Sequence, residues 1–150
     1  MKNTEIEQFT ELSENLLNHL VALEASIFEK PLAQDLFSTE LGGKKNLLVL
    51  VAFQNSQPCG YKIGYESSSN TFFSWSGGVL PDCRKCGLGS ALIAKQHQVA
   101  KELGYSYLRT HTKNKYRDML ILNIRSGFEV TGVYKSLQEA HQGIILEKAL

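Results

Sequence analysis

The sequence predicts a mixed α/β fold, in which helices flank a central, mostly antiparallel sheet of about six to seven strands. In several segments apolar residues recur at spacings of three and four, which is typical of amphipathic helices. Between them lie short apolar runs bounded by turn residues, which indicate strands. The chain has 150 residues, 43 % of them hydrophobic, which is enough for one well-buried core. We therefore expect residues 1–150 to form a single domain.

The N-terminal part of the chain is expected to hold the first strand and two helices. Residues 6–12 have the composition of a short strand. Between residues 14 and 41, leucines and other apolar side chains follow at helical spacing, which predicts two amphipathic helices. Pro31 separates these helices, and Gly42 and Gly43 end the second.

Three consecutive strands are expected next. The nearly continuous apolar run at residues 47–53 has strand length and predicts a central strand that is covered on both faces. Turn residues at 55–58 and 67–70 bound a second strand at residues 61–65, and residues 71–79 form the third. We expect these three strands to form an antiparallel meander.

The C-terminal half alternates helices and strands. A helix begins near Gly87 and ends at Gly104, because leucine and valine residues between them recur at spacings of four and seven. The elements expected after it are a strand at residues 105–110, a helix at 115–125, and strands at 128–134 and 143–147 joined by a loop at 136–142.

The loop before the Gly87 helix has the composition of an anion-binding site. Gly87 and Gly89 lie at a helix N-terminus, where the first N–H groups have no partner in the helix and the dipole is positive. Arg84 and Lys85 add positive charge beside them. The loop lacks the Lys of a Walker loop and the third glycine and later acidic residue of a dinucleotide fingerprint. We interpret it as a pyrophosphate cradle of another kind; the alternative is that the glycines serve only the turn.

The same residues match a known signature. Arg84, Gly87 and Gly89 in the segment RKCGLG follow the pattern of Arg or Gln with Gly three and five residues later, and Ser90 stands in place of the final small residue. The segment VLP precedes it, and KNKYRDMLILNIRSGF at residues 113–128 contains an Asn, a helix and a closing GF. In this combination and order the chain resembles the GNAT family of N-acetyltransferases over essentially its whole length.

The resemblance implies that acetyl-coenzyme A (acetyl-CoA) binds in a V-shaped opening where the fourth and fifth strands splay apart. The pantetheine arm would pair with the edge of the fourth strand, where the glycine pair Gly77 and Gly78 permits close approach and a local kink. Backbone N–H groups of residues 85–90 would hold the pyrophosphate, and the Val79 N–H would donate to the developing oxyanion. Coenzyme binding is thereby assigned to Gly78, Val79, Leu80, Arg84, Lys85, Cys86, Gly87, Leu88, Gly89, Ser90, Asn114 and Asn123.

The sequence departs from the family pattern at two positions. Many members place a Tyr that acts as an acid four residues before the closing Gly, where this chain has Asn123. An amide does not give up a proton, so we expect Asn123 to hydrogen-bond coenzyme or substrate. Some protein-modifying members place a Glu where this chain has Arg109, which would suit a substrate that carries a carboxylate. The alternative for Arg109 is a solvated strand residue.

The expected chemistry is direct attack of an amine on the thioester, and a base must first take a proton from the ammonium. His111 is a candidate because its unperturbed pKa is ~6.5 and it lies near the end of the fifth strand. Glu66, at the end of the third strand, and Glu24, on the first helix, are alternative bases. Tyr116 and Tyr134 are candidate acids. For each of them a structural or solvated role is the alternative.

Composition excludes several classes of partner. The net charge of +1, from 16 basic and 15 acidic side chains, provides no field to attract nucleic acid or an anionic membrane. No apolar stretch approaches the ~20 residues needed to span a bilayer, and no N-terminal stretch has the pattern of a targeting signal. Three cysteines do not form a secreted disulfide framework. We therefore expect a cytoplasmic protein without nucleic-acid or membrane partners.

Cys83 and Cys86 form a CxxC pair inside the predicted cradle. A structural zinc site needs four ligands, and the sequence has no second pair, so we expect no metal. One hypothesis is that oxidation of the pair would distort the cradle and weaken coenzyme binding; the alternative is that the two cysteines are incidental.

The function that the resemblance implies is transfer of an acetyl group to a primary amine, with a small-molecule amine as the expected partner. Two alternatives stay open, a protein amine as acceptor and a non-catalytic acyl-CoA-binding module. Dimerisation is common in the family, so a homodimer is a further expectation, although no segment of the chain specifies an interface.

Overall fold

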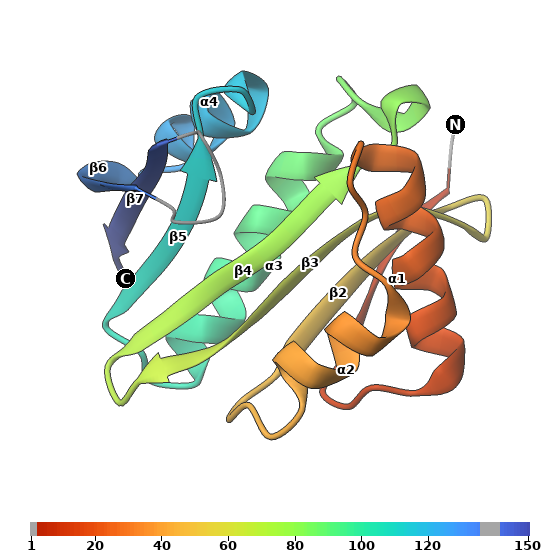
Figure 1. Ribbon diagram of the computed structural model, residues 1–150, viewed down its shortest axis with the longest axis horizontal. Coiled ribbons are helices and arrows are strands. Elements are labelled where there is room, and N and C mark those ends of the chain that lie inside the picture. Colours follow the sequence, from red (N-terminus) through yellow and green to blue (C-terminus); the bar gives the residue numbers. More distant parts are fainter. Residues whose placement is uncertain (1–2, 136–141) are drawn as a thin grey trace.

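Seven strands and four helices make up the described part of the protein, which a computed structural model gives for residues 3–135 and 142–150 (Figure 1). In chain order the elements are β1 (Thr4–Phe9), α1 (Glu14–Ile27), α2 (Gln34–Leu41), β2 (Leu48–Gln54), β3 (Gln57–Ser68), β4 (Thr71–Val79), a 3-10 turn (Pro81–Cys83), α3 (Leu88–Glu102), β5 (Tyr107–Lys113), α4 (Arg117–Arg125), β6 (Glu129–Lys135) and β7 (Gln142–Ala149). The predicted mixed α/β fold is confirmed. Of the predicted loop at residues 136–142, residues 136–141 lie outside the described residues.

All strands belong to one sheet, in the order β1-β2-β3-β4-β5-β7-β6. Every neighbouring pair is antiparallel except β4 and β5, which are parallel and are connected through α3. A parallel pair needs such a crossover, whereas antiparallel strands can follow each other through tight turns. The predicted meander of β2, β3 and β4 and the predicted mostly antiparallel sheet are both confirmed.

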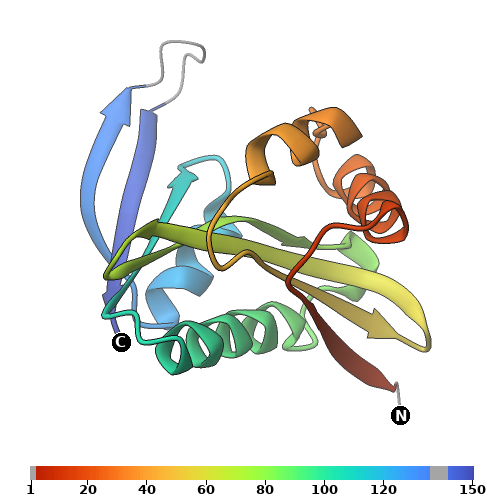
Figure 2. The same cartoon turned by 90° about the horizontal axis from the view of Figure 1, so that it is seen from below.

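Helices cover the sheet on both faces. α1 and α2 pack on one face and α3 and α4 on the other, with a core of apolar side chains under each pair (Figure 2). β2 shows the pattern clearly, because Leu48 and Leu50 belong to the core under α3 while Val49 and Val51 belong to the core under α1. A strand buried on both faces is apolar at every position, so the prediction of a doubly covered strand is confirmed. Among the described helices, none is long and apolar enough to cross a membrane.

The turns around β3 are tighter than the sequence predicts. Asn55 and Ser56 both have a positive φ, of 50° and 65°, which is the geometry of a two-residue hairpin turn. Pro58 therefore lies inside β3, which extends to Ser68 and is more than twice as long as the predicted strand at residues 61–65.

Several other boundaries also differ by two or three residues. The first strand is Thr4–Phe9 rather than residues 6–12, because Ser13 caps α1 by accepting a hydrogen bond from the Leu16 N–H at 3.1 Å. The fifth strand starts two residues late, since the N–H groups of Ser106 and Tyr107 both donate to the Asn70 carbonyl. The fourth helix starts at Arg117 rather than residue 115.

Candidate active site

β4 and β5 diverge near the middle of the sheet. They pair only between residues 71–74 and 107–110, so that the end of β4 and the end of β5 have no ladder between them (Figure 1). The opening continues into a cavity of about 740 Å³ whose wall comes from β4, the loop after it, α3, β5 and α4. This volume lies in the range of pockets for small molecules and cofactors.

The loop that enters α3 carries a row of free donors at the mouth of this cavity. Lys85 and Gly87 have positive φ angles of 63° and 83°, and Gly87 is the N-cap of α3. The N–H groups of residues 85–90 donate to no acceptor within the described part of the chain. Consecutive N–H groups in this conformation, at the positive end of a 15-residue helix, form an anion-binding concavity.

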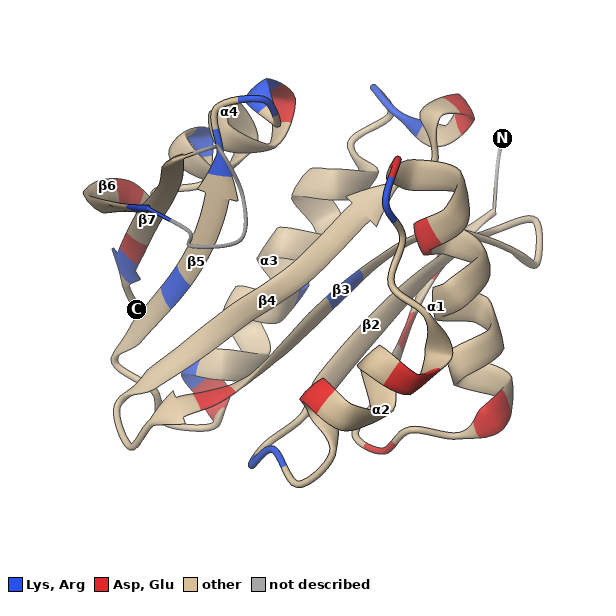
Figure 3. Cartoon of the chain, in the orientation of Figure 1, with Lys and Arg blue, Asp and Glu red and all other residues tan. Residues whose placement is uncertain are grey.

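Positive charge surrounds the same opening. Figure 3 shows basic residues on the loop before α3, at the tip of β5 and on α4, all at one end of the molecule. The basic side chains that line the cavity are Lys62, Arg84, Lys85, Lys113, Lys115, Arg117 and Arg125, and Asp118 is the only carboxylate in its described lining. This imbalance favours a ligand with several negative charges, although the net charge of the whole chain is only +1.

Two glycines near the cavity lie in close contact with side chains of neighbouring helices. A Cβ at Gly89 would lie 2.9 Å from Leu122 Cδ2 of α4, and one at Gly78 would lie 3.0 Å from Ile27 Cγ2 of α1. Real Cβ atoms rarely approach so closely, so a side chain at either position would push the neighbouring residue of α4 or α1 away. The local irregularity of β4 lies upstream of the glycine pair, at Trp75, which has no partner in the ladder with β3.

Val79 presents its backbone to the cavity. Its neighbour Leu80 donates its N–H to the Cys59 carbonyl on β3, with 2.8 Å between N and O. Because bonded and non-bonded pairs alternate along an antiparallel ladder, the adjacent pair of Val79 and Gly60 is a non-bonded one. The Val79 carbonyl instead accepts a hydrogen bond from Arg84 Nε at 2.9 Å. The Val79 N–H lies on this same open edge.

The part of β4 whose peptide groups face the opening is therefore shorter than the edge that the sequence predicts for coenzyme binding. By the same alternation Gly77 faces the opening, whereas the peptide groups of Gly78 and the N–H of Leu80 point to β3. Of the residues assigned to coenzyme binding, those that line the cavity are Gly78, Val79, Arg84, Lys85, Gly87, Leu88, Gly89, Ser90 and Asn123. Leu80, Cys86 and Asn114 lie outside its lining, and Asn114 is exposed.

Two buried polar groups in the cavity wall have no hydrogen-bond partner within the described part of the chain. Asn123 of α4 is 3 % exposed and its Oδ1 accepts no hydrogen bond from the described residues. Ser74, the last residue of β4 that pairs with β5, is 2 % exposed and its Oγ is likewise unpartnered there. An unpaired buried polar group is costly, so both atoms are suited to hydrogen bonds with a polar ligand.

His111 lies at the opening of β4 and β5, as the sequence predicts. Its ring packs against Phe73 and Tyr134, with ring centroids 5.0 and 5.1 Å away, and it lines the cavity. Burial, and then the charge of Arg109, lower the pKa of His111 below its usual value. A lowered pKa keeps the imidazole neutral near pH 7, the form that accepts a proton.

Of the other residues considered for the site, Tyr116 lines the cavity, whereas Glu66 and Arg109 do not. Glu66 pairs with Lys45 at 3.5 Å and does not line the cavity; because β3 and β4 are antiparallel, the end of β3 meets the start of β4, away from the opening. Arg109 forms an ion pair of 3.5 Å with Glu147 on β7 and also lies outside the lining. Tyr116 does line the cavity, at the start of α4.

Glu24 is buried beneath β4 rather than solvated. It accepts a short hydrogen bond from the Tyr61 hydroxyl and a long one, 3.5 Å, from Ser76 Oγ. Burial, and then the charge of Glu24, raise the pKa of Tyr61 far above its usual value, so this phenol keeps its proton. Ser76 lines the cavity, whereas Glu24 does not and contacts it only through Ser76.

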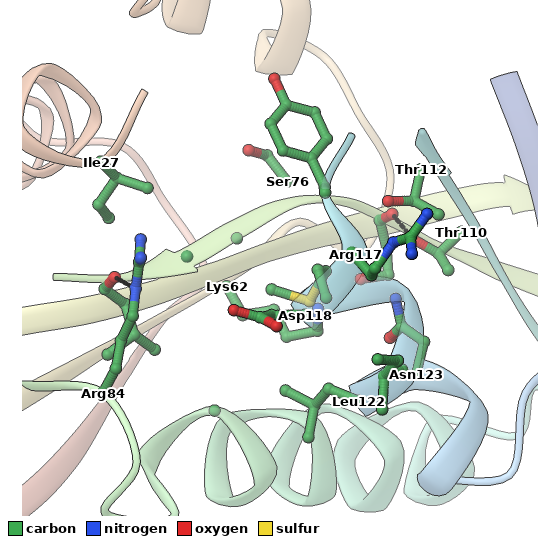
Figure 4. Close-up of a pocket in the computed structure, with 18 of the residues that line it drawn as sticks. Ile27, Lys62, Ser76, Arg84, Thr110, Thr112, Arg117, Asp118, Leu122 and Asn123 are labelled. Atoms are coloured by element: carbon green, nitrogen blue, oxygen red, sulfur yellow. Dashed lines mark hydrogen bonds between the residues drawn. The ribbon is translucent and has the colours of Figure 1, made fainter. Parts of the chain in front are cut away.

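Lys62 lines the cavity and was not predicted from the sequence. It stands in the middle of β3, between the apolar residues Tyr61 and Ile63, and is 6 % exposed. A lysine in an otherwise apolar strand was the available signal, because lysine is almost never fully buried unless it is paired. Figure 4 shows it with Arg84, Asp118, Leu122 and Asn123 around the cavity.

The two loop cysteines are unoxidised. Cys86 donates its S–H to the Cys83 carbonyl, with 2.9 Å between Sγ and O, and accepts a hydrogen bond from Gln54 Nε2 at 3.6 Å. Within residues 3–135 and 142–150, no three His, Cys, Asp or Glu side chains come together as metal ligands would.

Comparisons with known proteins agree with this geometry. The model of the acetyltransferase (GNAT) family matches residues 14–119. The ribosomal-protein-S18-alanine N-acetyltransferase of Escherichia coli has the same fold, with a TM-score of 0.83 and 18 % identity over 98 % of this chain and 94 % of that one. A GNAT acetyltransferase of Elizabethkingia anophelis with acetyl-CoA bound has a TM-score of 0.78 and 19 % identity over 99 % of both chains. The IAA acetyltransferase of Bacillus cereus has a TM-score of 0.77 and 20 % identity over 99 % of this chain and 100 % of that one. A search of curated proteins gives no match.

Proposed function

The chain belongs to the acetyltransferase (GNAT) family, and from this premise we propose that it transfers the acetyl group of acetyl-CoA to the primary amine of a small molecule. Its family makes it an acetyl-CoA-dependent N-acetyltransferase. The observation that carries the proposal is the row of N–H groups at residues 85–90, which have no acceptor among the described residues and lie at the mouth of a cavity between two splayed strands. We propose that residues 1–150 act as one domain.

The residues of the cavity fit the cosubstrate in three ways. The free N–H groups and the basic rim, including Arg84 and Lys85, suit the pyrophosphate. The open edge of β4 at Gly77 and Val79 offers peptide groups to the pantetheine arm of coenzyme A, which contains amides. The unpartnered Oδ1 of buried Asn123 can accept a hydrogen bond from an amide N–H of that arm.

The proposed chemistry is direct attack of the amine nitrogen on the thioester carbon. His111 takes the proton from the amine, for which its lowered pKa supports the neutral imidazole near pH 7. The Val79 N–H stabilises the charge that develops on the carbonyl oxygen, because a fixed backbone donor needs no reorganisation during the reaction.

The acceptor side of the cavity is aromatic. Phe28, Trp75 and Tyr134 line it together with His111, and Phe28 and Trp75 also pack on the core under α1 and α2. Such a wall supports an amine on a small apolar or aromatic carrier. A protein amine is the alternative acceptor, and release of CoA thiol with a panel of small amines and peptides distinguishes the two. A protein that binds acetyl-CoA but releases no thiol with any of them would instead be a binding module.

Calorimetric titration with acetyl-CoA tests the site, with Gly87→Asp compared with Gly87→Asn. Gly87 has a φ of 83°, a Cβ there would meet nothing within 4 Å, and Asn and Asp tolerate this conformation similarly. The two variants thus differ mainly by a charge beside the N–H row. We expect Asp to abolish binding and Asn to retain most of it. Equal binding by both variants would exclude the cradle, and no binding by the folded wild type would exclude the proposed function.

A further inference from the structure

Lys62 is a buried cation whose stem runs beneath β4. It pairs in the sheet with Leu50 on β2 and Gly77 on β4. Side chains paired across a sheet share a face, and Leu50 belongs to the core under α3. Lys62 therefore leaves β3 on the face that α3 and α4 cover, which is the face of Asn123 and Leu122.

Gly77 opens the path of this side chain into the cavity. A Cβ at Gly77 would lie 3.3 Å from Lys62 Cγ, closer than most real contacts allow. The absence of that Cβ lets the stem cross β4, and the side chain reaches the wall that Val79 and Asn123 also line. In Figure 4 Lys62 lies between Arg84, near the end of β4, and Asn123 on α4.

No described residue compensates the charge of Lys62. It forms no ion pair or hydrogen bond within the described ranges, although Asp118 lines the same cavity. The charged side chains and histidines that face Lys62 or its cavity are His97 on α3, Lys115 before α4, Arg117, Asp118 and Arg125 on α4, His111 and Lys113 on β5, Lys148 on β7, and Arg84 and Lys85 before α3. Most of these are cations, so they do not favour a charged lysine.

The effect of this environment appears in two pKa values. Burial lowers the pKa of Lys62 to about 8. Burial, followed by the charges of Lys148 and Lys62, lowers the pKa of His97 to about 4. A buried charge without a partner is expensive and is retained mostly where a function uses it.

The acetyl transfer generates an anion in this cavity. When the C–S bond breaks, its electron pair stays on sulfur, and a thiolate leaves more readily if a proton or a cation meets it. The residue four positions before Gly127, where the resembled family places a Tyr, is Asn123, which has no proton to give. The lining of the cavity offers Lys62 for this task, on the same wall as Asn123.

We propose that Lys62 is the proton donor to the sulfur of CoA. This inference rests on the proposed function. The acceptor nitrogen forms a bond to the acetyl carbon, the C–S bond breaks, and a proton from Lys62 Nζ passes to sulfur. The proton of the acceptor amine goes to the base. After the products leave, the base releases this proton to solvent and solvent returns one to Lys62, so that atoms and charge balance.

Binding of free CoA tests the contact without turnover. The ultraviolet absorbance of the bound CoA thiolate is followed between about pH 7 and 9 for wild type, Lys62→Met and Lys62→Gln. Lys101→Met, at an exposed position of α3, is the control. We expect wild type and the Lys101 control to lower the pKa of the CoA thiol by about one unit, and both neutral Lys62 variants to leave it unshifted. Desulfo-CoA, which has no thiol, should bind equally to all four proteins.

Kinetics test the proton transfer. We expect Lys62→Met and Lys62→Gln to lower kcat by about 10²-fold or more with little change in the KM for acetyl-CoA. Lys62→Arg should still stabilise the CoA thiolate but should lose kcat as well, because a guanidinium does not release its proton. Lys101→Met, at an exposed position of α3, should keep kcat within about threefold.

Several results would overturn the inference while the proposed function stands. One is an unshifted thiol pKa in wild type that binds CoA. Another is a Lys62 variant that raises only the KM of an acceptor carrying a carboxylate, which would make Lys62 an acceptor-binding residue. A large loss of kcat in Tyr116→Phe, with none in Lys62→Gln, would assign the proton to Tyr116. Failure of wild type to bind either CoA or acetyl-CoA would exclude the proposed function itself.

Discussion

Replacing Lys62 by methionine is expected to stabilise the folded protein, because it removes a buried charge that has no partner among the described residues. Burial lowers the pKa of Lys62 from 10.5 to about 8. One pKa unit corresponds to about 1.4 kcal/mol, so the folded state disfavours the ammonium by about 3 kcal/mol at neutral pH. Methionine has a similar length and no charge, and should recover most of this free energy. For a chain of this size the melting temperature should rise by about 6–12 °C.

The stability that Lys62→Met gains over wild type should decrease as the pH rises. Below about pH 8 Lys62 is protonated in both states and the wild type carries the whole penalty. Between about pH 8 and 10.5 the unfolded chain binds a proton that the folded chain does not, so wild-type stability rises with pH relative to the variant. Above this window neither state binds the proton, and the difference should disappear.

Urea unfolding of wild type and Lys62→Met at about pH 7 and pH 10.5 measures this difference. Other groups titrate in the same range, but they titrate in both proteins and cancel in the comparison. Lys101→Met, at an exposed position of α3, is the control and should change the free energy of unfolding by less than about 0.5 kcal/mol. A Lys62→Met variant less stable than wild type at pH 7, or a difference that stays constant up to pH 10.5, would refute the reasoning.

Three further substitutions test other parts of the structure. Gly78→Ala places a Cβ 3.0 Å from Ile27 Cγ2 and should cost about 1–3 kcal/mol in urea unfolding; an unchanged midpoint would mean that α1 yields freely. Tyr61→Phe removes the donor to buried Glu24 and should lower the free energy of unfolding by about 1–3 kcal/mol, a loss that calorimetry would detect and that a neutral result would contradict. His111→Gln should lower kcat/KM by about 10²-fold and abolish the acid limb that wild type shows below about pH 6.5; persistence of that limb would assign the base to another group.

The elements were predictable where their signals are local. The bounds of β4 and the start of α3 agree with the sequence, because Gly87 needs a positive φ and the helical spacing begins directly after it. The resemblance to GNAT acetyltransferases rests on the same segment and is confirmed. Boundaries shifted where a distant group decides them, as at Tyr107, whose N–H bonds to Asn70.

The composition of the site was less predictable, because it depends on which strand faces which. Glu66 and Lys62 lie four residues apart on β3, yet only Lys62 reaches the cavity, since the antiparallel pairing puts Glu66 at the far end of the sheet. The path of Lys62 depends on a glycine fifteen positions later in the chain, opposite it on β4. No local pattern encodes such a pairing. The role of Gly78 was equally hidden, because it depends on where α1 ends.

The short pairing of β4 with β5 has a mechanical consequence. Residues 71–74 and 107–110 form the whole ladder between the part of the sheet that begins with β1 and the part that ends with β6. A molecule bound in the opening and hydrogen-bonded to both strands would act as a brace across this seam, at the end where β4 and β5 have no ladder of their own. Amide hydrogen exchange in β5 and β7 should then slow when the opening is filled, and the cosubstrate would serve as a temporary part of the scaffold.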